Sequence, residues 1–100
     1  MADAGDFHDA HFEWSLAKAA RNERKHGISF EEAVRVFDYE AYLEAFDAVH
    51  SDAEDRYRVI GLIGSDLVCV VYADRGTRRR IISAHYADDD DKDMYARQFG

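Results

Sequence analysis

One run of residues constrains the fold of this chain more than any other, namely LVCVVYA at residues 67–73. Its side chains are almost all β-branched, aromatic or otherwise apolar, which is typical of a strand in the middle of a sheet. Turn residues bound the run on both sides, GSD at 64–66 and DRG at 74–76. These turns predict a neighbouring strand before and after the run, at residues 56–63 and 78–86, and therefore a meander of strands.

Two helices are expected before the meander. Ser15 is a favourable N-cap and Gly27 suits the left-handed residue that follows a helix, so residues 16–26 are expected to form the first helix. Ser29 begins the second helix, and Glu32 three residues later gives the spacing of a capping box. This second helix has an apolar stripe that we expect to be buried against the meander, formed by Phe30, Ala33, Val34 and Phe37.

A last helix is expected after the meander. Asp88 caps it, acidic residues fill its first turn, and Tyr95 and Phe99 are expected to pack inward. A short strand at residues 11–14 and a weaker one within 41–49 are also predicted. This order of elements predicts an α+β domain, in which helices gather on an antiparallel sheet.

Length and composition set further limits. A chain of 100 residues fits one domain, and residues 1–10 are expected to form a flexible leader before a domain at 11–100. No signal peptide is recognisable and the single cysteine, Cys69, has no partner for an internal disulfide, so a cytoplasmic protein is expected. No Gly-rich phosphate loop, cysteine pair or calcium-loop pattern is present, so neither a cofactor nor a metal is expected.

The charge is distributed unevenly along the chain. A net charge of −8 argues against broad, non-specific binding of nucleic acid. Ten of the 13 lysines and arginines nevertheless lie in three short islands, at residues 18–25, 56–58 and 75–80. Such islands are either solvated surface or the separate parts of one cationic site.

The last strand carries the side chains best suited to chemistry. With the period of two of a strand, Arg79, Ile81, Ser83 and His85 are expected to share one face. Arginine stabilises phosphate charge and histidine exchanges protons near neutral pH, which is most of what RNA cleavage through a 2′-hydroxyl requires. The simpler interpretation is that arginines at strand edges protect the sheet against aggregation.

The order of motifs along the chain closely resembles the BrnT family of type II toxins. The resemblance covers roughly residues 11–96 and is carried by FEW at 12–14, KAARNERKHGISFEEAVRVF at 18–37, LVCVVYADR at 67–75 and RIISAH at 80–85. It implies a RelE-like fold, with a small antiparallel sheet, two helices before most of it and one helix after. It also implies an endoribonuclease that cleaves mRNA and lowers translation.

The resemblance implies a partner as well. A BrnA-like antitoxin would neutralise the toxin and bind operator DNA, so the toxin would meet DNA only through its antitoxin. Dimerisation of the antitoxin would bring two toxins together in a heterotetramer, and no association with membranes is implied.

The family's motifs and the chemistry above together give a set of site residues. We expect Arg56 and Arg80 to stabilise phosphate and His85 to transfer a proton, without a metal. The residues expected to bind RNA are Lys18, Asn22, Lys25, His26, Arg75, Arg79 and Tyr95.

Two positions depart from the family's pattern. RIISA is usually followed by arginine, where this chain has His85, and Asp91 stands where glutamate is usual. Histidine keeps a titratable group but lacks the permanent planar fork of arginine. A second interpretation therefore stays open, a catalytically degenerate module with the toxin fold that pairs with a DNA-binding antitoxin and cuts no RNA.

Overall fold

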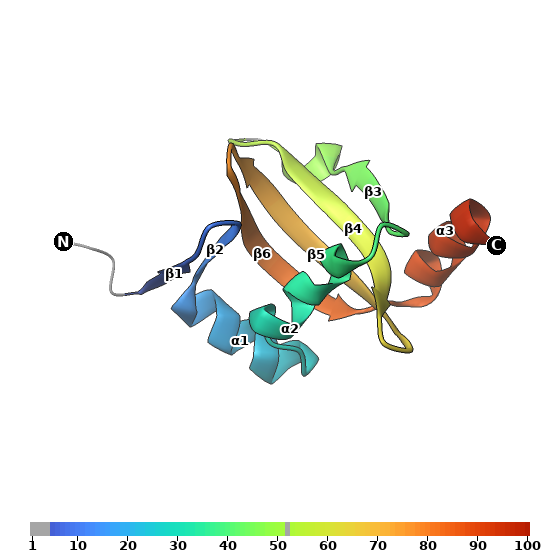
Figure 1. Cartoon of the computed structure of the whole chain (residues 1–100), viewed down its shortest axis with the longest axis horizontal. Coiled ribbons are helices and arrows are strands. Elements are labelled where there is room, and N and C mark those ends of the chain that lie inside the picture. The colour runs from blue at the N-terminus through green and yellow to red at the C-terminus, as the bar shows by residue number, and fades with distance from the viewer. Residues whose placement is uncertain (1–4, 52) are drawn as a thin grey trace.

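The structure is a computed structural model that describes residues 5–51 and 53–100 (Figure 1). Its elements are β1 (Asp6–His8), β2 (Phe12–Ser15), α1 (Leu16–His26), α2 (Phe30–Ala33), the 3₁₀ helix η1 (Val34–Asp38), β3 (Leu43–Phe46), the 3₁₀ helix η2 (Ala48–His50), β4 (Arg56–Ile63), β5 (Asp66–Arg75), β6 (Arg78–Tyr86) and α3 (Asp89–Phe99). They form an α+β fold, as the sequence predicts. No helix among the described residues is long and apolar enough to cross a membrane.

Six strands form one sheet in the order β1-β2-β6-β5-β4-β3. The strands β4, β5 and β6 form the expected antiparallel meander. β2, in contrast, runs parallel to β6, with Glu13 opposite Arg80, so the sheet is mixed and the expectation of a purely antiparallel sheet is wrong. No hairpin joins β2 to β6, and the sequence therefore carries no local signal for their relative direction.

The segment expected to be a flexible leader contributes a strand. β1 pairs with β2, and the ring of Phe7 stacks on that of Trp14 with 4.4 Å between the ring centres. Trp14 is buried, so this pair closes one end of the core. A strand of three residues is too short to show an alternating pattern, which is why the sequence does not reveal it. Residues 1–4 of the expected leader lie outside the described residues.

One face of the sheet carries the hydrophobic core, which α1, α2 and η1 cover (Figure 1). Phe30 is fully buried there with Val70 of β5, as the helical stripe predicts. The second helix is shorter than expected, because α2 has four residues and the chain continues as the five-residue η1. The tighter 3₁₀ winding turns Val36 into the core and leaves Val34 and Phe37 only partly buried.

Gly61 allows η1 to lie close against β4. A Cβ atom at this position would come within 2.8 Å of Cγ2 of Val36 and 2.9 Å of Cβ of Tyr42. Carbon atoms pack best at about 3.5–4.0 Å, so a larger residue would push the helix off the sheet.

A β-bulge in β6 interrupts the alternation of its side chains. Val71 of β5 lies opposite Ser83, but the next residue, Tyr72, lies opposite Ile81. Ile82 is therefore an extra residue without a partner on β5. Such a bulge moves every later side chain of the strand to the other face.

The bulge overturns the expected grouping of side chains on β6. Ile81 and Ala84 both lie in the core although they are three residues apart. Arg79 therefore does not share a face with His85, and Arg80 takes its place on that face. The prediction failed because a period of two holds only in a strand without an inserted residue.

α3 begins at the cap predicted for Asp88. Asp88 and Asp91 exchange side-chain to backbone hydrogen bonds of 2.9 and 3.1 Å, which form a capping box. The helix stands at one end of the sheet (Figure 1), and the hydroxyl of Tyr95 donates to the carbonyl of Ala41 over 3.3 Å. Phe99 is 42% exposed and packs on Tyr95, so the expectation that it faces the core is wrong.

Candidate active site

The face of the sheet opposite the core gathers polar side chains, and we call it the open face. Arg58 of β4 lies opposite Val71 of β5, which in turn lies opposite Ser83 of β6. Their side chains point to the same side of the sheet, because directly paired residues share a face. A groove of about 210 Å³ follows this row, lined by Asp47, Arg56, Arg58, Val71, Ile82, Ser83 and His85. We call it the catalytic groove.

Asp91 of α3 meets the open face beside His85. Its side chain is only 1% exposed. One carboxylate oxygen, Oδ2, lies 3.1 Å from Nε2 of His85 and accepts a hydrogen bond of 3.1 Å from the N–H of Asp88. The other oxygen, Oδ1, lies 3.5 Å from a guanidinium nitrogen of Arg58. A carboxylate bonded to one ring nitrogen holds a histidine in place and favours proton exchange at the other nitrogen.

Cys69 lies beneath this group. It is the cross-strand neighbour of His85, and it is fully buried. Burial, together with the negative charge of Asp91, raises the pKa of its thiol to about 12. The thiol is therefore protonated at neutral pH, and because only a thiolate is a good nucleophile, it is unsuited to covalent catalysis.

A second groove, of about 380 Å³, runs along α1 and shares Ile82 and Ser83 with the catalytic groove. Where the two grooves meet, the ring centres of His26 and His85 lie 5.8 Å apart. Burial lowers the pKa of His26, and the charges of His85 and Lys25 lower it further. We call it the basic groove after the α1 residues that line it, which are Lys18, Arg21, Asn22, Lys25 and His26.

Asn22 serves the fold although it lines this groove. Its side chain is buried, and its amide nitrogen donates to the carbonyl of Ala84 over 2.8 Å and to that of Ile28 over 3.3 Å. Its amide oxygen accepts a hydrogen bond of 3.1 Å from the N–H of Ala84. The side chain therefore continues the pairing of β6 beyond the end of β2, and its polar atoms are used within the protein.

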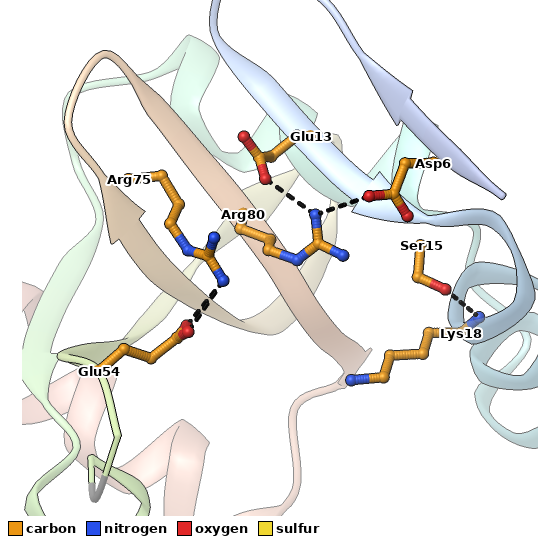
Figure 2. A network of polar contacts seen from close by, with 7 residues as sticks. All are labelled: Asp6, Glu13, Ser15, Lys18, Glu54, Arg75 and Arg80. Carbon is orange, nitrogen blue, oxygen red and sulfur yellow. Dashed lines mark hydrogen bonds and ion pairs between the residues drawn. The ribbon is translucent and has the colours of Figure 1, made fainter. Parts of the chain in front are cut away.

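Arg80 lies on the open face but is already paired with acids (Figure 2). Its guanidinium binds Glu13 at 2.8 Å and Asp6 at 3.4 Å. Burial alone would lower the pKa of Arg80, but the hydrogen bonds to Glu13 and Asp6 outweigh it and raise the pKa. The two carboxylates around the guanidinium of Arg80 neutralise the positive charge that would otherwise attract a phosphate.

Three other residues expected to bind RNA line neither groove. Arg75 pairs with Glu54 at 2.9 Å (Figure 2). Arg79 lies on the core side, where its guanidinium is 4.3 Å from the ring centre of Phe37 in a cation–π contact. Tyr95 lies on α3, with its hydroxyl bonded to the main chain.

Comparison with known families decides what kind of protein carries these grooves. A model of the BrnT toxin family, described as the ribonuclease toxin BrnT of type II toxin–antitoxin systems, matches residues 14–91. The chain belongs to the BrnT family. A comparison with curated proteins gives no match.

BrnT membership agrees with where the grooves lie. Every residue that lines the two grooves is within the matched segment, as is the buried Asp91 at its end. β1 and most of α3 are outside it. Because the BrnT family consists of ribonuclease toxins of type II toxin–antitoxin systems, membership implies that this chain is such a toxin and that it has an antitoxin as its partner.

Arg58 and Asp91, which lie in the BrnT catalytic groove region, were not in the predicted set of site residues. Arg58 has a detectable signal, since it follows Arg56 by two positions in one strand and must share its face. The sequence gives no sufficient signal for Asp91, because a capping box predicts a carboxylate that is exposed to solvent at the start of a helix. Its burial against His85 depends on how α3 docks on the sheet.

Proposed function

We propose that this BrnT toxin is a cytoplasmic, metal-independent endoribonuclease that cleaves mRNA at the catalytic groove and so inhibits translation. The observation that carries the proposal is the contact of 3.1 Å between His85 and the buried Asp91, at the end of an arginine-lined groove. Such a group combines a proton carrier with stabilisation of phosphate charge.

In the proposed reaction His85 takes the proton of a 2′-hydroxyl while that oxygen attacks the adjacent phosphorus. A new P–O bond forms, and the bond between phosphorus and the 5′-oxygen of the next nucleotide breaks. The leaving 5′-oxygen gains a proton from the imidazolium or from water, which leaves a 2′,3′-cyclic phosphate and a 5′-hydroxyl. Asp91 stabilises the imidazolium while it exists, as a carboxylate does in other proton-transfer pairs.

Arg56 and Arg58 are the proposed groups that stabilise the phosphorane. Within the part of the chain that the structure describes, Arg56 forms no ion pair, and its Nε atom is buried without a hydrogen-bond partner. A phosphate oxygen would satisfy such a guanidinium. Arg58 lies 3.5 Å from Asp91, beyond the usual range of a strong hydrogen bond, so it can turn toward substrate. Arg80 is the weaker candidate, because Glu13 and Asp6 already neutralise it.

RNA is proposed to reach the catalytic groove along the basic groove. Lys18 and Lys25 are exposed on α1, and His26 lies beside His85 where the two grooves join. The local positive charge of this path opposes the net charge of −8. Phosphate contacts of this kind position a chain without reading its bases.

The finer features of the family are part of the same proposal. The meander with helices on one face is compatible with a RelE-like arrangement. A BrnA-like antitoxin is the proposed partner, in a complex of two toxins and two antitoxins that meets operator DNA through the antitoxin. Co-expression followed by size-exclusion chromatography tests this, and a toxin that elutes alone would contradict it.

A second candidate function is a toxin-fold module that binds an antitoxin but cuts no RNA. The observation that favours it is that Arg58, Arg75 and Arg80 are all paired with acids in the free chain. In that case the grooves would serve recognition of a protein, and loss of His85 would leave RNA untouched.

The decisive experiment is single-turnover cleavage of RNA by the wild type, His85→Ala and His85→Arg. If His85 transfers the proton, His85→Ala should lower the rate by roughly 10²–10⁴-fold. His85→Arg should be slowed in the same way, because a guanidinium stays charged and accepts no proton near neutral pH.

The matched control is His11→Ala, since His11 is exposed and lines neither of the two grooves. It should cleave like the wild type. Unaltered cleavage by His85→Ala would remove the histidine from the mechanism. Absence of cleavage by the wild type, together with intact RNA after induction without an antitoxin, would leave the non-cutting module.

A further inference from the structure

We propose that Cys69, His85 and Asp91 form a binding site for a thiophilic divalent cation such as Zn²⁺, and that the bound ion silences the catalytic groove. The three residues come from β5, β6 and α3, so only the tertiary fold brings them together. The first part of the proposal stands independently of catalysis, while the second rests on the proposed function of His85.

The geometry suits a tetrahedral ion. One ligand atom from each residue, the sulfur, a ring nitrogen and a carboxylate oxygen, lies within 4.8 Å of the others. Nε2 of His85 and Oδ2 of Asp91 are already 3.1 Å apart. Nitrogen and oxygen ligands at about 2.0–2.1 Å from a tetrahedral zinc lie about 3.3 Å from each other, and a sulfur ligand lies about 3.5 Å from each of them. The widest of the present separations, which are all within 4.8 Å, would have to shorten by roughly an ångström when the ion binds.

The burial of the donors points to a ligand as well. Cys69 is fully buried, its thiol makes no hydrogen bond with any described residue, and it lies directly beneath His85. Asp91 is 1% exposed, whereas His85 is 28% exposed and lines the catalytic groove. An ion can therefore arrive from the groove on the histidine side, and a water from the groove can take the fourth position.

The chemistry of the donors favours a borderline or soft ion. Thiolate and imidazole ligands select zinc and related ions over magnesium or calcium, which prefer oxygen donors. Binding breaks the S–H bond of Cys69, forms a metal–sulfur bond and releases the proton to solvent, because only the thiolate is a ligand. Thiolate and carboxylate then balance the two positive charges of the ion.

Occupation of the site would remove the groups proposed for catalysis. The ion takes the lone pair of Nε2 on His85 and a carboxylate oxygen of Asp91, so that the pair no longer exchanges a proton. Arg58, 3.5 Å from the other oxygen of Asp91, opposes binding of a cation. Replacing it by glutamine should therefore strengthen binding of the ion even though the groove loses an arginine.

The test is titration of the purified chain with Co²⁺ and Zn²⁺ in the absence of RNA. Co²⁺ reports directly on the ligands, because a bound thiolate gives an intense charge-transfer absorption in the near ultraviolet. We expect one ion per chain and this absorption in the wild type. Cys69→Ser should lose the absorption, and both Cys69→Ser and Asp91→Asn should weaken Zn²⁺ binding by at least about 10-fold, the loss that even outer partners of a metal site cause.

Matched controls are His11→Gln and Asp93→Asn, which remove an exposed histidine and an exposed carboxylate. Both should bind like the wild type. Folding of each variant is checked by circular dichroism, and the cobalt spectrum of the wild type keeps the test valid if Cys69→Ser does not fold. A wild type that binds no ion, or binds it without the thiolate absorption, would overturn the proposed site.

Inhibition is tested separately by adding Zn²⁺ to the cleavage reaction and then removing it with a chelator. We expect cleavage to fall with occupancy and to recover, and Cys69→Ser to resist the ion. Ion binding to a wild type that never cleaves RNA would refute the proposed ribonuclease and leave the metal site standing. Cleavage that continues at full occupancy would overturn the silencing role alone.

Discussion

The two faces of the sheet use the same strands but are held together by different forces. On the core face, apolar residues such as Trp14, Phe30 and Val70 are at most 2% exposed and are stabilised by burial and packing. On the open face, Arg80 is held by carboxylates from β1 and β2, and Arg58 lies 3.5 Å from the carboxylate of Asp91 on α3. Packing on the first face supplies stability, and the polar contacts on the second supply position.

This difference separates folding from chemistry within single strands. Val59 and Arg58 are neighbours in β4, yet one is buried in the core and the other lines the catalytic groove. Substitutions on the core face should therefore lower stability, and those on the open face should lower activity. Asp91 is the exception that tests the division, because it is as buried as a core residue but its carboxylate binds His85 and Arg58.

The largest effect on stability is expected from Phe30→Ala on the core face. Truncation of a fully buried phenylalanine should lower the free energy of unfolding by about 3–5 kcal/mol, because it removes apolar contacts and leaves a cavity. Chemical denaturation measures the loss. Phe99→Ala is the matched control, since Phe99 is 42% exposed on α3, and it should cost far less. Equal losses for the two variants would show that the core does not lie where Phe30 is.

An intermediate effect on stability is expected from Asp91→Asn, which tests whether a buried residue of the open face serves stability, activity or both. The amide cannot satisfy Arg58, His85 and the N–H of Asp88 together, so the free energy of unfolding should fall by about 1–3 kcal/mol. RNA cleavage should fall as well. Asp93→Asn, whose carboxylate is 75% exposed, should change neither. Full activity with lowered stability would show that Asp91 stabilises the fold but takes no part in cleavage.

The smallest effect on stability at neutral pH is expected from two groups buried in the sheet, the thiol of Cys69 and the phenol of Tyr72. Their effect on stability grows as the pH rises above neutral. Burial raises the pKa of Cys69 from 9.0 to about 12 and that of Tyr72 from 10.0 to about 12. The folded state therefore holds both protons more tightly than the unfolded state does. Their stabilisation is complete below about pH 9 and is lost as the pH rises toward 12.

Cys69→Ala isolates the contribution of the thiol. The variant should lose less stability than the wild type between about pH 9 and pH 10, where the unfolded thiol is mostly ionised and the unfolded phenol is at most half ionised. Thermal melts across this range measure the slope. Tyr39→Phe, which removes an exposed phenol, should leave the slope unchanged. A slope in Cys69→Ala identical to that of the wild type would contradict burial of the thiol.

The sequence was a reliable guide wherever a local signal was strong. β4 and β6 begin and end at the residues expected from the turns, α1 runs from Leu16 to His26 between its cap and its glycine, and the capping box at Asp88 begins α3. It was a poor guide where tertiary contacts decide. The 3₁₀ winding of η1, the parallel pairing of β2 with β6 and the position of Phe99 all depend on distant neighbours.

The candidate site shows the same limit more sharply. Arg56 and His85 could be named from the family's motifs and the strand pattern, and the structure places both along one groove. The bulge at Ile82 exchanged Arg79 for Arg80 on the open face, and the docking of α3 placed Asp91 on His85. A change of register or a helix contact leaves no trace in local periodicity, because both are fixed by pairing between residues far apart in the chain.

Local chemistry therefore determined most of the helices and strands, and the order of motifs along the chain indicated the family. Turns, caps and alternating side chains act over a few residues, where backbone preferences and nearby hydrogen bonds dominate. The tertiary structure decided which polar and charged side chains are bound within the protein and which remain available to a ligand. Asn22 is bound to the main chain of β6, Arg80 is closed by Glu13 and Asp6, and Asp91 is buried against His85, because those contacts form only when the core face has packed and brought the open face together.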